Sequence, residues 1–155
     1  MKLQIKILKE QEICDNKIQI KTFIYELINP YINKNISQEV DRIYNNMNTF
    51  IKDNTAIIIG AFNENVLIGF IWGYIKKENI EEAHVNYFFI KDNYRSQGIG
   101  KLLIKEMQEK LSCMNVKKIE LLVDKTNEKA INFYAKQGFS VKEKKENKIK
   151  LIKEI

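Results

Sequence analysis

The chain has 155 residues, of which 45% are hydrophobic and 30% are charged, and this composition predicts one soluble globular domain, residues 1–155, around a single core. Its longest apolar run, Val66 to Ile75, is too short to cross a bilayer, so a membrane span is excluded. Neither Cys14 nor Cys113 has a Cys or His neighbour at metal-binding spacing, which excludes a zinc module. A reduced, cytoplasmic protein is therefore expected. The net charge of +6 suits an anionic partner, but the lysines are scattered and form no stripe with aromatic residues, so nucleic-acid binding is not favoured.

Hydrophobic spacing in the first third of the chain predicts one strand followed by two helices. Apolar and polar residues alternate from Leu3 to Leu8, which is the pattern of a half-buried strand and not the apolar core of a signal peptide. Apolar residues then recur at helical spacing from Ile20 to Ile28, and this helix should end before Pro30. Ser37 is a good N-cap for a second helix, whose apolar face runs from Val40 to Ile51.

The remaining two thirds of the chain alternate between strands and helices. Two strands form a hairpin with a short turn at residues 63–65, and a third strand leads into a glycine-containing loop. In chain order, the expected elements are strands Ala56–Phe62, Val66–Ile75 and Val85–Ile90, a helix from Ile99 to Met114, a strand Ile119–Val123, a helix Asn127–Gln137, and strands Phe139–Lys144 and Lys148–Ile155. This order predicts an α/β (α+β) sandwich with a mixed sheet and no internal repeat.

The stretch Arg95-Ser96-Gln97-Gly98-Ile99-Gly100-Lys101 connects a predicted strand to a predicted helix. The first N–H groups of a helix have no hydrogen-bond partner within the helix and lie at the positive end of its dipole. Where glycines allow close approach to these groups, a phosphate group is the expected ligand. A P-loop is excluded because Arg95 and Leu102 replace its first glycine and its Ser or Thr. A dinucleotide loop is excluded because Leu103 replaces its third glycine. The alternative is a glycine-containing turn without a ligand.

The pattern Arg95-x-x-Gly98-x-Gly100 resembles the acyl-coenzyme A pyrophosphate loop of the GNAT N-acetyltransferase superfamily, although Asp92 stands where a proline is usual. A second segment, Asn127 to Phe139, is similar to the helix of that family that carries Asn, Ala, Phe-Tyr and Gly-Phe at fixed spacing. The order of the predicted elements also agrees with that family. The resemblance implies a mixed, mostly antiparallel central sheet with helices on both faces. It further implies acetyl-CoA as the co-substrate and no metal.

The resemblance also implies which residues bind acetyl-CoA. Pantetheine would lie like an extra strand against the backbone of Phe88, Phe89 and Ile90. Asn127 would hydrogen-bond the co-substrate near its reactive end. The backbone of the loop, and not the side chain of Arg95, would contribute most of the pyrophosphate binding. The N–H groups concerned belong to Ser96, Gln97, Gly98, Ile99, Gly100 and Lys101.

Acetyl transfer to an amine needs a base, because only the neutral amine attacks a thioester. His84 is the only histidine of the chain, and it occupies the position where histone-type family members carry a glutamate and arylalkylamine-type members carry a histidine. His84 is therefore the first candidate for the base and Glu82 the second. The alternatives are a hydrogen-bonded sheet histidine and a solvated glutamate. In the ribosomal-protein branch the base glutamate occupies the position of Leu122, so that site design is not expected.

Tyr134 lies where the family places the acid for the departing thiolate, and it would also contact the co-substrate. A tyrosine with a pKa near 10 is a weaker acid than a thiol near 8.5, so full proton transfer in water is uphill by roughly 2 kcal/mol. We expect the Tyr134 hydroxyl to donate a hydrogen bond that strengthens as the sulfur gains charge. The alternative is packing, since Ile131 and Tyr134 share a helical face.

The leading function is transfer of an acetyl group from acetyl-CoA to a primary amine by direct attack in a ternary complex. The alternative is a non-catalytic acyl-CoA sensor or structural module of the same fold, and a protein that binds RNA or anionic surfaces is the least favoured. Small amines, polyamines, aminoglycosides and protein amines all remain open as acceptors, and a homodimer is compatible with the sequence. Candidate residues for a cation-binding pocket are Glu26, Glu39, Asp41, Glu81 and Glu82.

Overall fold

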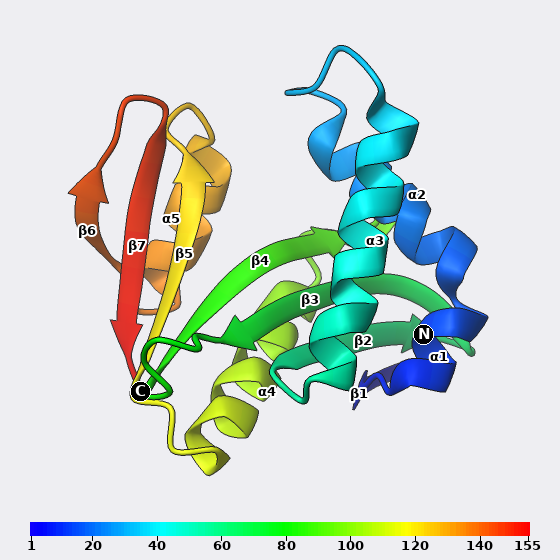
Figure 1. The fold of residues 1–155 in the computed structure, drawn as a ribbon, viewed down its shortest axis with the longest axis horizontal. Coiled ribbons are helices and arrows are strands. Elements are labelled where there is room, and N and C mark those ends of the chain that lie inside the picture. Colours follow the sequence, from blue (N-terminus) through cyan, green and yellow to red (C-terminus); the bar gives the residue numbers. More distant parts are fainter.

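A seven-stranded sheet organises the computed structural model, which describes residues 1–155 (Figure 1). The strand order is β1-β2-β3-β4-β5-β7-β6, and all neighbours are antiparallel except β4 and β5, which are parallel. The bounds are β1 Leu3–Ile7, β2 Ala56–Asn63, β3 Val66–Ile75, β4 Glu82–Ile90, β5 Lys118–Asp124, β6 Ser140–Lys144 and β7 Lys148–Glu154. The fold is therefore the mixed, mostly antiparallel sheet that the sequence predicted.

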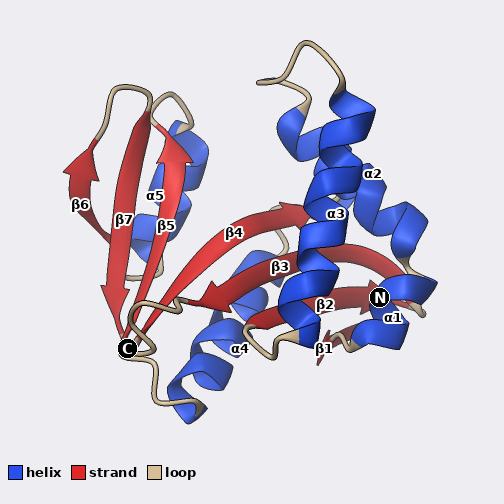
Figure 2. Ribbon diagram, viewed as in Figure 1, coloured by secondary structure: helices blue, strands red, loops and turns tan.

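Helices cover both faces of this sheet (Figure 2). Their bounds are α1 Glu10–Asp15, α2 Lys17–Ile28, α3 Ile36–Lys52, α4 Ile99–Cys113 and α5 Glu128–Lys136, with a short 3₁₀ helix at Asp92–Tyr94. Buried residues of α4 and α5 form one core with the sheet, and buried residues of α1, α2 and α3 form a second core on its other face. No helix of this fold has both the length and the apolarity that crossing a bilayer requires.

The central strands read as continuous apolar runs because both of their faces are buried. Seven consecutive residues of β3, from Leu67 to Gly73, are buried, and so are the six residues of β2 from Ile57 to Phe62. Trp72 and Phe70 lie in the core beside α2 and α3, whereas Ile68 and Ile71 lie in the core beside α4. The alternating pattern of β1 agrees with its position at the edge of the sheet.

The observed elements differ from the predicted ones mainly before residue 40. The six-residue helix α1 was not predicted, because Ile13 is its only buried residue and gives no periodic signal. A hydrogen bond of 2.9 Å from the Lys9 N–H to a carboxylate oxygen of Glu12 stabilises its first turn. Helix α3 begins at Ile36 after Asn35, which has a φ of 55°, so Ser37 is not the N-cap that the sequence suggested.

Strands β4 and β5 diverge after a short region of pairing. Their residues pair from Glu82 with Lys118 to Val85 with Leu121, and beyond this point the two strands separate (Figure 1). On its other side β4 stays paired with β3, although the register shifts so that Asn86 is an extra residue in β4. From Asn86 to Ile90, the edge of β4 that faces β5 has no strand partner. The sheet is thus opened into a wedge next to the glycine-containing loop.

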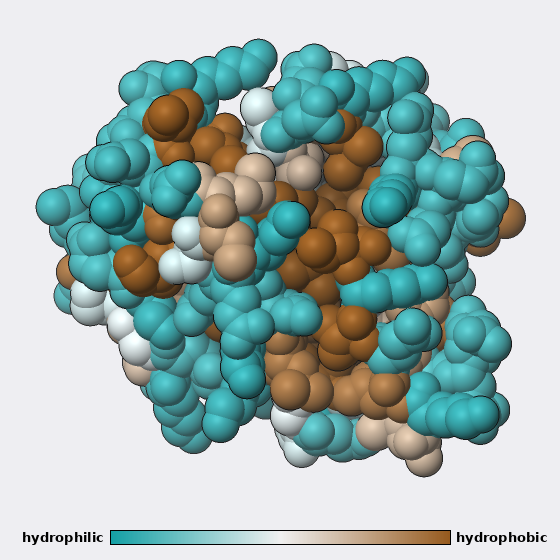
Figure 3. All heavy atoms as spheres, turned by 90° about the horizontal axis from the view of Figure 1, so that it is seen from below, coloured by the Kyte–Doolittle hydropathy of each residue, from teal (hydrophilic) through white to brown (hydrophobic).

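The outer edge of β1 is also unpaired, because β1 is the first strand of the sheet. Figure 3 shows the molecule from below the view of Figure 1, and apolar atoms gather in the middle of this face with polar atoms around them. Ile7 of β1 is 41% exposed. At the opposite edge, all residues of β6 are exposed, and two of them are lysines. Both edges also expose an apolar side chain, since Val141 of β6 is 51% exposed.

Candidate active site

The loop between β4 and α4 presents a run of free backbone donors. None of the six N–H groups from Ser96 to Lys101 donates a hydrogen bond to another backbone group, and the first helical bond of α4 runs from the Leu102 N–H to the Gly98 carbonyl oxygen at 3.2 Å. Ser96 and Gly98 have φ values of 59° and 83°, which turn the chain sharply before the helix. These donors lie at the positive end of a 15-residue helix, so the loop is suited to bind an anion such as a phosphate group.

The two glycines of the loop are required for different reasons. Gly98 has a positive φ, and a side chain there would extend into open space. Gly100 lies in the first turn of α4, where a Cβ atom would be 3.1 Å from Cζ of Phe88 and 3.2 Å from Cζ of Phe133. Gly98 therefore permits the turn and leaves the donors accessible, whereas Gly100 lets α4 pack closely against β4 and α5.

The side chain of Arg95 fastens the loop to the end of β4. Its Nε donates a hydrogen bond of 2.8 Å to the carbonyl oxygen of Ile90, and its Nη1 lies 2.6 Å from Oδ1 of Asp92. The guanidinium group also lies over the ring of Phe89, 5.5 Å from the centroid. These contacts hold the Arg95 side chain against its own loop and β4, and the larger share of the backbone in anion binding stays a prediction.

The three predicted contact residues of β4 point to alternating faces. Phe89 is buried on the α2 side, where its ring stacks on Phe23 with centroids 4.6 Å apart. Phe88 faces α5, with its ring 5.7 Å from that of Phe133, and Ile90 packs against the same core. The side chains are thus occupied by packing, and the edge of this strand that faces β5 has no strand partner, although the carbonyl oxygen of Ile90 already accepts the hydrogen bond from Arg95.

Helix α5 carries the two other predicted residues near the reaction centre. Asn127 is the N-cap of α5, and its Oδ1 accepts a hydrogen bond of 3.2 Å from the Ala130 N–H. Tyr134 lies seven positions later, about two helical turns, so both residues lie along one side of α5. The ring of Tyr134 is buried against Phe133 and Phe139, and burial raises the pKa of its hydroxyl well above the usual value. This hydroxyl is therefore a hydrogen-bond donor that resists losing its proton.

His84 lies on β4 just before the strands diverge, and it points away from the α4 core that contains Ala83 and Val85. Its Nδ1 is 3.2 Å from Oε1 of Glu120 on β5, and its ring is 5.5 Å from that of Tyr74. Burial lowers the pKa of His84 below its ordinary value, while the hydrogen bond with Glu120 opposes this shift. A half-buried, neutral imidazole near pH 7 is suited to act as a base.

Glu82, the second candidate base, is held in two ion pairs. Its carboxylate is 2.6 Å from Nζ of Lys118 and 2.9 Å from Nζ of Lys76. The hydrogen bonds from these two lysines lower the pKa of Glu82 to about 2. A carboxylate with so low a pKa binds a proton weakly, so the geometry favours His84 over Glu82 as the base.

Glu120 contacts the candidate base His84, and the sequence analysis did not name it. It pairs in register with His84 across the parallel strands, 36 positions away in the chain, and no sequence motif marks it. Leu122, two residues further along β5, is 42% exposed, so an apolar side chain lies at the position of the base glutamate of the ribosomal-protein branch. Only the strand pairing identifies Glu120.

Three of the five acidic residues named as candidates for a cation-binding pocket are already paired with cations. Glu39 pairs with Arg42 on α3, and Oδ1 of Asp41 is 2.6 Å from Nζ of Lys21. Glu82 is neutralised by lysines, as described above. These carboxylates are therefore matched by cations of the chain itself.

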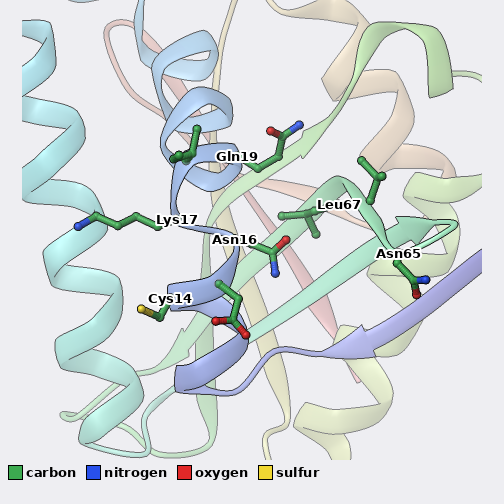
Figure 4. Close-up of a pocket in the computed structure, with 9 residues that line it drawn as sticks. Cys14, Asn16, Lys17, Gln19, Asn65 and Leu67 are labelled. Atoms are coloured by element: carbon green, nitrogen blue, oxygen red, sulfur yellow. The ribbon is translucent and has the colours of Figure 1, made fainter.

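Two surface cavities lie outside the predicted motifs. One of about 450 Å³ is lined by residues 14–19, at the junction of α1 and α2, and by residues 65–67 of the β2–β3 hairpin (Figure 4). The other, of about 360 Å³, lies where Tyr31, Asp124 and Lys148 come together, and Nζ of Lys148 is 5.1 Å from the centroid of the Tyr31 ring. Neither cavity contains a residue of the loop, His84 or Tyr134.

Comparisons with known proteins agree with this geometry. The model of the acetyltransferase (GNAT) family matches residues 21–139. A spermidine N(1)-acetyltransferase from Thermoplasma acidophilum is 27% identical over 118 residues, which are 76% of this chain and 70% of that protein. The crystal structure of the PaiA N-acetyltransferase from Thermoplasma acidophilum in complex with coenzyme A has a TM-score of 0.82 at 22% identity, covering 100% of both chains. An acetyltransferase of the GNAT family from Staphylococcus aureus has a TM-score of 0.78 at 16% identity, covering 98% of both chains. Motifs, fold and family match agree, and the chain belongs to the acetyltransferase (GNAT) family of transferase enzymes.

Proposed function

We propose that this enzyme transfers an acetyl group from acetyl-CoA to a primary amine, by direct attack of the amine within a ternary complex. The observation that carries the proposal is the run of six free N–H donors at the start of α4, next to the unpaired edge of β4. An elongated molecule with a pyrophosphate and an amide-containing arm matches both features, because the donors suit the phosphates and a strand edge suits the arm.

Acetyl-CoA is the co-substrate, and the chain offers each part of it a partner. The N–H groups of Ser96 to Lys101 receive the pyrophosphate, and the backbone of Phe88, Phe89 and Ile90 receives the pantetheine arm. Asn127, at the start of α5, keeps its side-chain N–H group free for a ligand, because its Oδ1 already accepts the capping hydrogen bond. The coenzyme A complex of the PaiA N-acetyltransferase, which has the same fold, supports this assignment.

The chemistry requires a neutral amine and a stabilised leaving group. An amine with a pKa near 10.4 needs about 4–5 kcal/mol to reach its free base at pH 7, so a base must assist. His84 takes the proton from the acceptor nitrogen, whose lone pair forms the new C–N bond at the acetyl carbon. The electrons of the C–S bond leave with the sulfur. The Tyr134 O–H donates a hydrogen bond to this sulfur, and its raised pKa keeps that hydrogen on the tyrosine until the thiolate charge has developed.

Polyamines are the first acceptors to test. The spermidine N(1)-acetyltransferase among the relatives supports this choice. Aminoglycosides, small amines and protein amines belong in the same panel, because the acidic residues near α3 are already paired with cations of the chain. A homodimer stays a prediction, and light scattering on the purified protein tests it.

The test is release of free thiol from acetyl-CoA in the presence of each acceptor, with mass spectrometry of the acetylated product. The proposal predicts release with at least one class of amine, and loss of that release in Tyr134→Phe. Acetyl-CoA that raises the melting temperature but is never consumed would instead favour the non-catalytic acyl-CoA sensor. If acetyl-CoA is not consumed and does not change the melting temperature either, that result would contradict the assignment of the site itself.

A further inference from the structure

We propose that Glu120 is the positioning residue for His84: its carboxylate holds the Nδ1–H group, so that the unprotonated Nε2 is left to accept the proton of the acceptor amine. This inference rests on the proposed acetyl transfer, and it adds a residue of β5 to a site whose predicted members came from β4 and α5. Every proton in this step has a defined position, because the amine proton moves to Nε2 while the Nδ1 proton stays between His84 and Glu120.

The placement of the pair follows from strand register. His84 and Glu120 are directly paired residues of the parallel strands β4 and β5, and one further pair, Val85 with Leu121, follows before the strands diverge. The Nδ1 to Oε1 distance is 3.2 Å, and the two side chains are only 15% and 13% exposed. The pair therefore lies at the closed end of the wedge, where the unpaired edge of β4 begins.

The charges around Glu120 keep its carboxylate ionised. Nζ of Lys76 is 2.7 Å from Oε1, and Nζ of Lys150 is 3.9 Å from Oε2. Burial raises the pKa of Glu120, but the hydrogen bonds from Lys76 and His84 outweigh burial, so the pKa lies below its ordinary value. An ionised carboxylate only accepts hydrogen bonds. The Nδ1 of His84 must then carry the hydrogen, and in the neutral imidazole this leaves Nε2 as the acceptor.

The groups that face His84 come from four strands. Tyr74 belongs to β3, which Lys76 directly follows, Glu82 to β4 itself, Glu120 to β5 and Lys150 to β7. Burial and the two lysines lower the pKa of His84, whereas Glu120 raises it. Without Glu120, the imidazole would be a weaker base, because Lys76 and Lys150 would still disfavour the imidazolium formed during the reaction. Glu120 is thus the contact that raises the pKa of His84.

The single histidine of the chain makes this arrangement directly measurable. Nitrogen-15 NMR of the free enzyme reports the tautomer, and the expected form carries hydrogen on Nδ1. A pH titration reports the pKa of His84 in the wild type and in Glu120→Gln. Because Glu120 raises this pKa, the variant should titrate at lower pH, and the acidic limb of its kcat/KM profile should move to lower pH with it. Turnover should fall by about 10–100-fold, the loss typical when a carboxylate that orients a histidine is removed.

Glu143→Gln is the matched control. Glu143 lies 3.8 Å from Lys150 and belongs to the same ion-pair network, but it does not contact His84. The control therefore removes the same charge from the network, and it should leave the pKa of His84 and the turnover unchanged. Glu120→Asp, which keeps the charge on a shorter side chain, should keep the pKa of His84 closer to the wild-type value than Glu120→Gln does.

Three results would overturn the inference. The first is hydrogen on Nε2 in the wild type, which needs no variant and so does not depend on the variant folding. The second is a pKa of His84 that is unchanged or raised in Glu120→Gln. The third is a loss of turnover from Glu120→Gln that is as large in a His84→Gln background as in the wild type. If the wild type itself releases no thiol, the proposed function fails, whereas the tautomer and the titration still decide the role of Glu120.

Discussion

Tyr134 and His84 lie on different faces of the sheet, beside the wedge between β4 and β5. Tyr134 belongs to the core formed with α4 and α5, whereas His84 points away from that core toward the side of Tyr74 and Glu120. Direct attack on a thioester needs the amine to approach from one direction and the thiolate to be stabilised in another. The separation of the proposed base and the proposed hydrogen-bond donor fits this requirement.

Replacing Tyr134 by phenylalanine tests the donor at the sulfur. The ring contacts with Phe88, Phe133 and Phe139 should persist, so stability and acetyl-CoA affinity should change little. Turnover should fall by roughly 10²–10⁴-fold, the usual contribution of a positioned acid or donor. Steady-state kinetics of thiol release, together with a thermal shift by acetyl-CoA, separate the two effects. Unchanged turnover would remove Tyr134 from the mechanism.

Gly98→Ala tests whether the loop is a binding element or only a turn. Forcing an alanine into the left-handed region that Gly98 occupies, at a φ of 83°, should cost about 1–2 kcal/mol of stability. The added methyl group also extends into open space, and because Gly98 belongs to the proposed pyrophosphate loop, acetyl-CoA affinity should fall as well.

Gly138→Ala is the control, because Gly138 has a similar φ of 92° but lies after α5, outside the loop. It should lose at least as much stability, since a Cβ there would be 3.1 Å from Cε of the hydrogen-bonded Lys153, and it should keep its affinity. Equal affinity in both variants, measured by calorimetry, would mean that the phosphates do not lie on this loop.

At the level of single elements, Asn127 both caps helix α5 and is proposed to contact acetyl-CoA. Oδ1 of Asn127 caps the helix through the Ala130 N–H, and its amide N–H₂ group remains for a ligand. The cap explains why an asparagine suits this position even without a ligand. The two roles use different atoms of one side chain, so substitution can separate them.

Two substitutions of Asn127 make that separation. Asn127→Asp keeps a capping oxygen but removes the donor, so the free energy of unfolding should stay near the wild-type value while kcat/KM falls. Asn127→Ala removes both and should also cost about 1 kcal/mol of stability. Urea denaturation and thiol-release kinetics check the pair. Wild-type kcat/KM in Asn127→Asp would assign Asn127 to capping alone.

Elements with strong periodicity were predicted well, and short or locally capped ones were not. The strand Val66–Ile75 has the predicted bounds, because a buried apolar run ends on each side at polar residues. Helix α1 was missed because a single buried residue, Ile13, produces no pattern. The start of α3 was misplaced because Asn35, in a left-handed conformation, ends the loop before Ser37 is reached. Local signals fail where one residue decides the boundary.

The residues of the candidate site likewise fall into those that the sequence indicates and those that it does not. The loop residues and Tyr134 could be proposed from the sequence because their spacing along the chain is itself a signal. Glu120 was not found, since its relation to His84 depends on the register of two parallel strands joined by a long crossover through α4. The extra residue Asn86 in β4, which precedes the unpaired edge, also leaves no trace in the sequence pattern. Pairing between distant strands is what the sequence alone does not determine.

At the scale of the whole molecule, an ion-pair network crosses the sheet from β3 to β7. Lys76, Lys118 and Lys150 alternate with Glu82 and Glu120 at distances of 2.6–3.9 Å. The network lies across the strands that remain paired at the closed end of the wedge, on the face of the sheet that carries His84. It therefore links the stability of the sheet to the protonation of the site.

This network should make the fold acid-sensitive in two steps. The pKa of His84 is lower in the folded protein than in the unfolded chain. As the pH falls below about 6.5, His84 is therefore protonated first in the unfolded chain, and the folded protein loses stability. Glu82 has a pKa of about 2 in the fold, so its contribution is complete above about pH 4.5 and is lost as the pH falls toward 2. Urea denaturation across this range should show both slopes. His84→Gln should flatten the slope that begins near pH 6.5, and Glu82→Gln should flatten the slope between about pH 4.5 and 2. A variant that leaves its own slope unchanged would contradict the assignment.

Backbone amide NMR during titration with acetyl-CoA tests directly where the co-substrate lies. The amide signals of Ser96 to Lys101 should move most, downfield as phosphate oxygens accept their hydrogens, together with those of residues 86–90 on the unpaired edge of β4. Signals that move instead around residues 14–19 and 65–67, or around Tyr31 and Lys148, would place the ligand in one of the two surface cavities and contradict the proposed placement.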